Sequence, residues 1–189
     1  LGNAERFVEL FGAWVRYCAE WEEWLVWDGR RWCANANAEL MRMAHATIRR
    51  IHSEAVHAQD LEQRRMIVKH ALASEAQSRV ENMLLSAKPY VTVHADQLDQ
   101  HPMLLNVANG VVDLSTGTLL EHDPGHLITK LINVSYEPAA ECHEWTKFLN
   151  LVTGGDPALQ DFIKIAVGYT LTGRTDAHCL FVLYGTGAN

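Results

Sequence analysis

The feature that most constrains the fold is a long stretch of helical periodicity from about residue 38 to residue 88. Apolar residues recur there three or four positions apart, which places them on one side of a helix. Three stripes result: Leu40, Ala44, Ile48, Ile51 and Ala55; then Val68, Ala71 and Leu72; then Val80, Met83, Leu84 and Ala87. The pattern predicts a helical body that ends at Pro89, where proline disrupts the helix.

Within this stretch, Ser74-Glu75-Ala76-Gln77 matches a capping box. In such a box the serine and glutamine side chains each satisfy a backbone N–H at the start of a helix. We therefore expect the third helix of the body to begin here. Asn3 is expected to cap an earlier helix whose apolar positions run from Phe7 to Cys18.

Hairpin signals flank the helical body. Asp28-Gly29 favours a two-residue turn, because both central residues of that turn need positive φ. This turn would pair Trp27 with Arg30, and Leu25 with Trp32. Downstream, Asn109-Gly110 separates two apolar runs, and the turn at 115–117 precedes a third. A small antiparallel meander is therefore expected, with one more strand over residues 127–136.

Two helices and a strand are predicted towards the end of the sequence. Trp145, Phe148, Leu149 and Val152 mark the first helix, and Gly154 supplies its left-handed cap. Asp156-Pro157 opens the second helix with a cap and a proline at its first position; its stripe is Leu159, Phe162, Ile163, Ala166 and Tyr169. Residues 178–184 are continuously apolar, as in a strand buried on both faces. The predicted fold class is α+β.

Composition excludes some classes of protein. No apolar run is long enough to cross a bilayer, no signal peptide is apparent, and the four cysteines are scattered, so we expect a cytoplasmic protein with reduced thiols and no membrane association. The net charge of −7 argues against general adhesion to nucleic acid. Residues 42–88, however, hold eight basic and five acidic residues, so one basic segment is set in an acidic chain.

The apolar run leads into Gly185, Thr186, Gly187, Ala188 and Asn189, which match the first five positions of a phosphate-binding P-loop. The glycines of that loop let backbone N–H groups surround phosphates, and a following lysine neutralises their charge. We expect the sequence to stop inside this Walker A motif, with Gly-Lys-Ser or Gly-Lys-Thr to follow. A glycine-rich surface tail is the alternative.

Several blocks in order resemble phage and plasmid primase-helicases, a group related to the poxvirus primase-helicase. They are residues 27–32, 105–117, 122–124 with 128–130, 168–173 and 181–189. The resemblance implies that residues 1–138 form the conserved domain N-terminal to a superfamily-three helicase. Residues 139–175 would be a helical connector to the motor, and residues 176–189 the first strand and P-loop of the ATPase.

The same resemblance implies a parent enzyme, an ATP-dependent DNA helicase and primase that uses ATP and Mg²⁺. Its implied partners are single-stranded or forked DNA, an upstream primase region, and further copies that form a hexamer through the motor. The region itself is expected to be non-catalytic and to hold no cofactor or metal. A protein-interaction module for the primase or a loader is one alternative, and a cryptic primase or nuclease fragment is another.

Ten basic or aromatic residues are candidates for DNA contact: Arg30, Arg31, Trp32, Arg42, Arg49, Arg50, Arg64, Arg65, Lys69 and Lys130. Cations bind the phosphate backbone, and aromatic rings stack on bases. The alternative for the hairpin is that its tryptophans pack in the core while its arginines face solvent. The alternative for the helical cations is a solvated face, partly paired with Glu54, Glu62 and Asp60.

Overall fold

The computed structural model describes residues 2–182. The chain divides into two compact units, one formed by residues up to 100 with 123–130, the other by residues 101–122 with those from 131 onward. These units do not follow the predicted boundary at residue 138, which stays a prediction. The mixture of helices and small, mainly antiparallel sheets confirms the α+β class.

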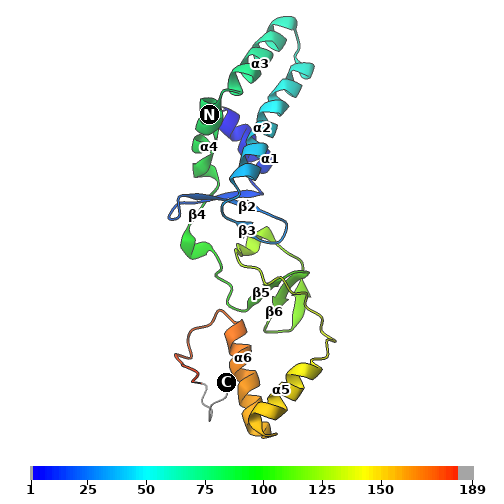
Figure 1. Ribbon diagram of the computed structural model, residues 1–189. Helices are drawn as coiled ribbons and strands as arrows, with labels where there is room; N and C mark the ends of the chain where they lie inside the picture. The colour runs from blue at the N-terminus through cyan, green and yellow to red at the C-terminus, as the bar shows by residue number, and fades with distance from the viewer. Residues whose placement is uncertain (1, 183–189) are drawn as a thin grey trace. The chain divides into compact units, whose positions relative to one another are not determined.

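Helices form most of the first unit (Figure 1). They are α1 (Gly2–Phe11), α2 (Asn37–Glu54), α3 (Leu61–Ser74) and α4 (Gln77–Ala87), with short 3-10 turns at Ala55–His57, Lys88–Tyr90, Ala95–Gln97 and Pro124–His126. The stripes predicted for α2 and α4 are all buried. On α3, by contrast, Ala71 is buried while Leu72 is 58% exposed. The predicted helical body is thus confirmed, but α3 buries only Ala71 and Ser74.

A four-stranded sheet supports these helices. Its strands are β1 (Val15–Cys18), β2 (Glu23–Trp27), β3 (Trp32–Cys33) and β4 (Thr92–Val93), in the order β3-β2-β1-β4. Side chains alternate between the faces of a strand. Val15 and Val26 consequently face the helices, whereas Leu25 and Trp32 join a second core on the opposite face.

Three predictions at the start of the chain are wrong. Asn3 lies inside α1 instead of capping it, and its amide donates to the Ser74 hydroxyl at 3.0 Å. The opening helix ends at Phe11, and Cys18 lies in β1, which pairs with β2 and β4. Cross-strand pairing outweighs helical spacing that continues for about two more turns, from Phe11 to Cys18. In the hairpin, Trp27 pairs with Trp32 rather than with Arg30. The loop has four residues because the Asp28 carboxylate accepts the backbone N–H groups of Arg30 and Arg31, both at 2.8 Å.

The predicted capping box is also wrong. Ser74 is the last residue of α3, and its hydroxyl donates to the carbonyl oxygen of His70 at 2.8 Å. The cap of α4 is Ala76, which has no side-chain hydrogen bond. A capping arrangement instead opens α3, where Asp60 accepts the N–H of Gln63 at 2.7 Å.

The second unit contains the predicted meander. Its strands β5 (Leu104–Val107), β6 (Gly110–Asp113) and β7 (Thr118–Leu120) are antiparallel in sequence order. Val107 pairs with Gly110, so the first turn consists of Ala108 and Asn109, one residue earlier than expected. The strand predicted over residues 127–136 is wrong, because this segment makes only an isolated parallel bridge between Ile132 and Val107.

Helices α5 (His143–Thr153) and α6 (Pro157–Leu171) complete the second unit. Their end signals are confirmed: Gly154 has a φ of 63°, and the Asp156 carboxylate accepts the N–H of Ala158 at 2.9 Å. Of their apolar residues only Leu149 is buried. Residues 178–182 form no strand, which contradicts the expected buried strand over that part, while 183 and 184 lie outside the described residues. No helix between residues 2 and 182 is long and apolar enough to cross a membrane.

Candidate nucleic-acid interface

The outward side of α3 carries a basic face, which we define as Leu61, Arg64, Arg65, Val68, Lys69 and Leu72. These residues line a shallow hollow of about 450 Å³. Their spacing of three and four residues places them along one stripe of α3, which borders the buried Ala71. The structure therefore brings together the three cations that the sequence predicted on this helix.

The cations of this basic face have no counter-ions in the described part of the chain. Arg64, Arg65 and Lys69 are exposed, and no carboxylate lines the hollow. The acids expected to pair with them act elsewhere: Glu54 binds Arg6 at 2.7 Å, and Asp60 caps the helix. The positive charge of this face is thus directed to solvent.

The arginines of α2 differ among themselves. Arg42 forms an ion pair with Glu39 at 2.5 Å, so its charge is already compensated. Arg49 and Arg50 are exposed, and Arg50 lies near the Arg6–Glu54 pair. Arg49 forms no ion pair with a described residue, so its charge adds to the positive charge of this helical region.

The hairpin residues occupy contrasting positions. Trp32 is 1% exposed and packs in the second core, where Arg16 lies 4.8 Å from its ring centre. A ring this deeply buried presents no face to a base. Arg31 is half-buried and donates to the Thr129 carbonyl oxygen at 3.4 Å, whereas Arg30 is exposed.

Burial changes the acid–base properties of this hairpin. The guanidinium of Arg16 has a lowered pKa because it is desolvated beside Trp32. Burial and a hydrogen bond to the Asp28 carboxylate at 3.2 Å raise the pKa of the Cys33 thiol. The thiol is therefore held protonated as a donor to the loop.

Lys130 is exposed at the end of the segment 123–130, which packs on the hairpin. The Asp99 carboxylate fixes the neighbouring Thr129, accepting its N–H at 2.7 Å and its hydroxyl at 2.6 Å. Arg30, Arg31 and Lys130 thus come from two sequence blocks that meet in the first unit. Local sequence patterns do not reveal this contact, because the residues that form it lie about a hundred positions apart.

A second polar site was not foreseen. Arg79, Asn82 and Ser86 of α4 line a pocket together with residues of α1 and α3. Their spacing of three and four residues is the signal that could have found them, since it places them side by side on a helix. Between residues 2 and 182, no group of three or more His, Cys, Asp or Glu side chains is placed to hold a metal ion.

The predicted P-loop residues, Gly185, Thr186, Gly187, Ala188 and Asn189, lie outside the described residues. Comparison with curated proteins finds no match. Residues 4–154, most of the chain, match a family model described as D5 N terminal like. This agrees with the resemblance of the sequence blocks to the region that precedes the motor of primase-helicases. The chain belongs to the D5 N-terminal-like family.

Proposed function

We propose that this region positions DNA beside the ATP-driven hexameric helicase of a phage- or plasmid-type primase-helicase, and that it is itself non-catalytic. The observation that carries the proposal is the basic face of α3, where three cations without counter-ions share one exposed side. Membership of the D5 N-terminal-like family supports the replication context. We infer that the protein acts in the cytoplasm.

The chemistry of the basic face suits a phosphate backbone. Each cation that neutralises a phosphate releases condensed counter-ions, which makes binding weaken as salt rises. The chain as a whole is acidic, with a net charge of −7. Repulsion by that charge would confine DNA to the few surfaces where positive charge is concentrated. Arg49 and the exposed Arg30 are secondary contacts in this proposal.

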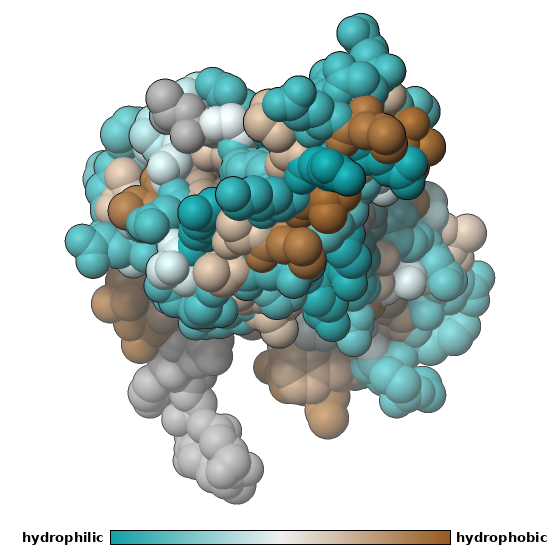
Figure 2. Space-filling view, turned by 90° about the horizontal axis from the view of Figure 1, so that it is seen from above, coloured by the Kyte–Doolittle hydropathy of each residue, from teal (hydrophilic) through white to brown (hydrophobic). Residues whose placement is uncertain are grey.

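A protein-interaction role is the second candidate, for binding a primase or a loader. It is favoured by the apolar residues of the same face, since Leu61 is 73% and Leu72 58% exposed. Figure 2, viewed from above Figure 1, shows brown apolar side chains set among teal polar ones. Exposed apolar area of this kind is typical of binding surfaces. A complex held by these residues would depend only weakly on salt.

The two candidates are separated by titrating fluorescent single-stranded and forked DNA with the 189-residue chain at several salt concentrations. DNA positioning predicts binding whose affinity falls with salt, with a logarithmic slope of about −2 for three phosphate contacts to a single strand. Replacing Arg49 and Arg50, or Arg30 and Arg31, by alanine should weaken binding less than changes on α3. No binding at low salt would contradict the DNA role and leave the protein-interaction role.

The catalytic parts of the parent protein remain proposals. ATP and Mg²⁺ would bind a motor whose P-loop begins at Gly185 and continues with Gly-Lys-Ser or Gly-Lys-Thr after Asn189. We expect no ATP hydrolysis by the 189-residue chain, because it lacks that lysine. A cryptic primase or nuclease would reveal itself by Mg²⁺- or Mn²⁺-dependent primer synthesis or DNA cleavage by the purified chain.

A further inference from the structure

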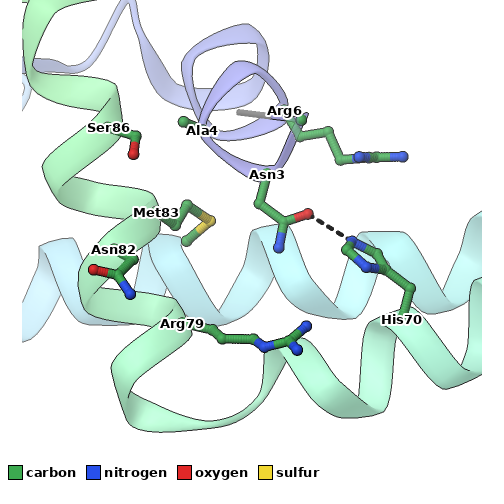
Figure 3. A pocket seen from close by; sticks show the side chains of 9 residues that line it. Asn3, Ala4, Arg6, His70, Arg79, Asn82, Met83 and Ser86 are labelled. Atoms are coloured by element: carbon green, nitrogen blue, oxygen red, sulfur yellow. Dashed lines mark hydrogen bonds between the residues drawn. The ribbon is translucent and has the colours of Figure 1, made fainter.

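A pocket of about 300 Å³ lies among α1, α3 and α4 (Figure 3). Asn3 comes from α1, His70 from α3, and Arg79, Asn82 and Ser86 from α4. Figure 3 shows the side chain of Arg79 running from α4 towards His70 and Asn3. The pocket is thus bounded by three helices of one unit and is distinct from the basic face of α3.

One wall of the pocket is held by a chain of hydrogen bonds. The Asn3 amide donates to the Ser74 hydroxyl at 3.0 Å, and that hydroxyl donates to the His70 carbonyl oxygen. The Asn3 carbonyl oxygen is therefore the acceptor for His70 Nε2, at 2.9 Å. Since an amide oxygen can only accept, Nε2 of His70 carries a hydrogen and donates it to Asn3.

The α4 wall supplies donors without partners. The side chains of Arg79, Asn82 and Ser86 form no hydrogen bond or ion pair with any described residue. No carboxylate lines the pocket, and the guanidinium of Arg6 is neutralised by Glu54 through bonds of 2.8 and 2.7 Å. Arg79 is consequently the lining cation that has no counter-ion.

We propose that this pocket binds a phosphate monoester group, with Arg79 as its principal anchor. A guanidinium offers a planar pair of N–H donors that matches two phosphate oxygens, and such charge-assisted bonds are among the strongest in proteins. The Asn82 amide and the Ser86 hydroxyl add neutral donors on the same helix. A volume near 300 Å³ is at the lower end for ligand pockets and suits a phosphate with its attached sugar.

The first test is an NMR titration of the ¹⁵N-labelled 189-residue chain with inorganic phosphate. Saturable shifts are expected for the Arg79 side chain and for the amide groups of Asn3 and Asn82. Arg79→Gln should weaken binding about tenfold or more, because it removes a charged hydrogen-bond donor. Arg79 is exposed without described partners, so the variant should keep its native spectrum.

Lys147→Gln removes the same charge from α5 and should leave phosphate binding unchanged. Changing Arg64, Arg65 and Lys69 to glutamine should also leave it unchanged, so this site and the DNA-binding proposal can fail separately. Absence of saturable shifts, or equal binding by the Arg79→Gln variant, would overturn the site.

The source of the phosphate is distinguished by paired ligands: adenosine 5′-monophosphate against adenosine, and a short oligonucleotide with a 5′-phosphate against the same strand with a 5′-hydroxyl. Tighter binding of the phosphorylated strand assigns the site to strand ends, and tighter binding of the nucleotide assigns it to free nucleotides. Either result supports the proposal. Equal binding of the phosphorylated and unphosphorylated members of both pairs contradicts it.

Discussion

The indole Nε1 of Trp32 donates to the carbonyl oxygen of Pro124 at 2.9 Å, across 92 residues of sequence. The backbone N–H of Trp32 also donates to the Ile128 carbonyl oxygen at 2.9 Å. Residues 27–32 and 123–130, which belong to two of the blocks that resemble primase-helicases, therefore pack together within the first unit. These hydrogen bonds stabilise the fold of the first unit, which also carries the basic face of α3.

Trp32→Phe tests the hydrogen bond to Pro124. The phenyl ring keeps most of the buried apolar area but cannot donate to Pro124, whose carbonyl oxygen then keeps only the bond from the Leu127 N–H at 3.2 Å. We expect a loss of about 1 kcal/mol in the free energy of unfolding, the typical contribution of one intramolecular hydrogen bond. Urea denaturation measures it. Trp21→Phe is the control, because Trp21 is 44% exposed and should change stability little; equal effects of the two variants would contradict the account.

Asp99→Asn tests the attachment of the segment 123–130. Asp99 has a φ of 55°, a conformation that asparagine also tolerates, so the backbone should persist. The amide can replace only one of the two acceptors for Thr129, which should cost about 1 kcal/mol. Hydrogen exchange at the Trp32 amide, bonded to Ile128, should accelerate. Asp96→Asn, at an exposed neighbouring position, should leave that exchange rate unchanged.

The Glu20–His94 pair predicts a pH dependence. A hydrogen bond of 2.7 Å from His94 lowers the pKa of Glu20 to about 2, and the same contact raises the pKa of His94 above 6.5. Glu20 therefore contributes stability above about pH 4.5 that is lost as the pH falls towards 2. His94 contributes stability below pH 6.5 that is lost as the pH rises through its folded pKa.

An NMR titration of the His94 ring measures this directly. Glu20→Gln should lower the pKa of His94 towards its ordinary value, because the neutral amide no longer favours the charged ring. Glu22→Gln, two residues away and without a described bond to His94, is the matched control. An unchanged His94 titration in the Glu20→Gln variant would show that the ion pair does not form in solution.

Asp156→Ala tests the cap of α6. The carboxylate accepts the N–H groups of Ala158 and Leu159, and losing such a cap typically costs about 1 kcal/mol. Helix fraying should appear as faster hydrogen exchange in the first turn of α6. Asp156→Ser, which retains a capping oxygen, should restore most of the protection. If Asp156→Ala keeps the protection of the unchanged chain, the cap contributes nothing.

Local patterns predicted most helices because burial follows the helical period. The stripe from Leu40 to Ala55 and the cap at Asp156 depend only on neighbouring residues. Val15–Cys18 was assigned to a helix because its strand partners were not apparent from local spacing: β4 lies more than seventy residues away. The two-residue turn predicted at Asp28-Gly29 is wrong because the Asp28 carboxylate accepts two backbone N–H groups and so stabilises a four-residue loop. A rule based only on φ does not include such side-chain hydrogen bonds.

For the candidate site too, local spacing predicts some features, whereas others depend on tertiary contacts. Arg64, Arg65 and Lys69 were found from spacing because one helix carries them all. Whether they had counter-ions depended on tertiary contacts, such as the one that directs Glu54 to Arg6. The burial of Trp32 and the pocket beside Arg79 each require three segments to meet, which no local pattern reveals.

The central claim is tested most directly by DNA binding of two triple variants with equal charge. Arg64, Arg65 and Lys69 are changed to glutamine in one, and Lys147, Lys164 and Arg174 in the other. Affinity for single-stranded DNA is measured across a salt series. The account predicts that only the α3 variant loses affinity and that its salt slope flattens by about two. Equal affinities and equal slopes for the two variants would contradict a DNA-positioning role for this face.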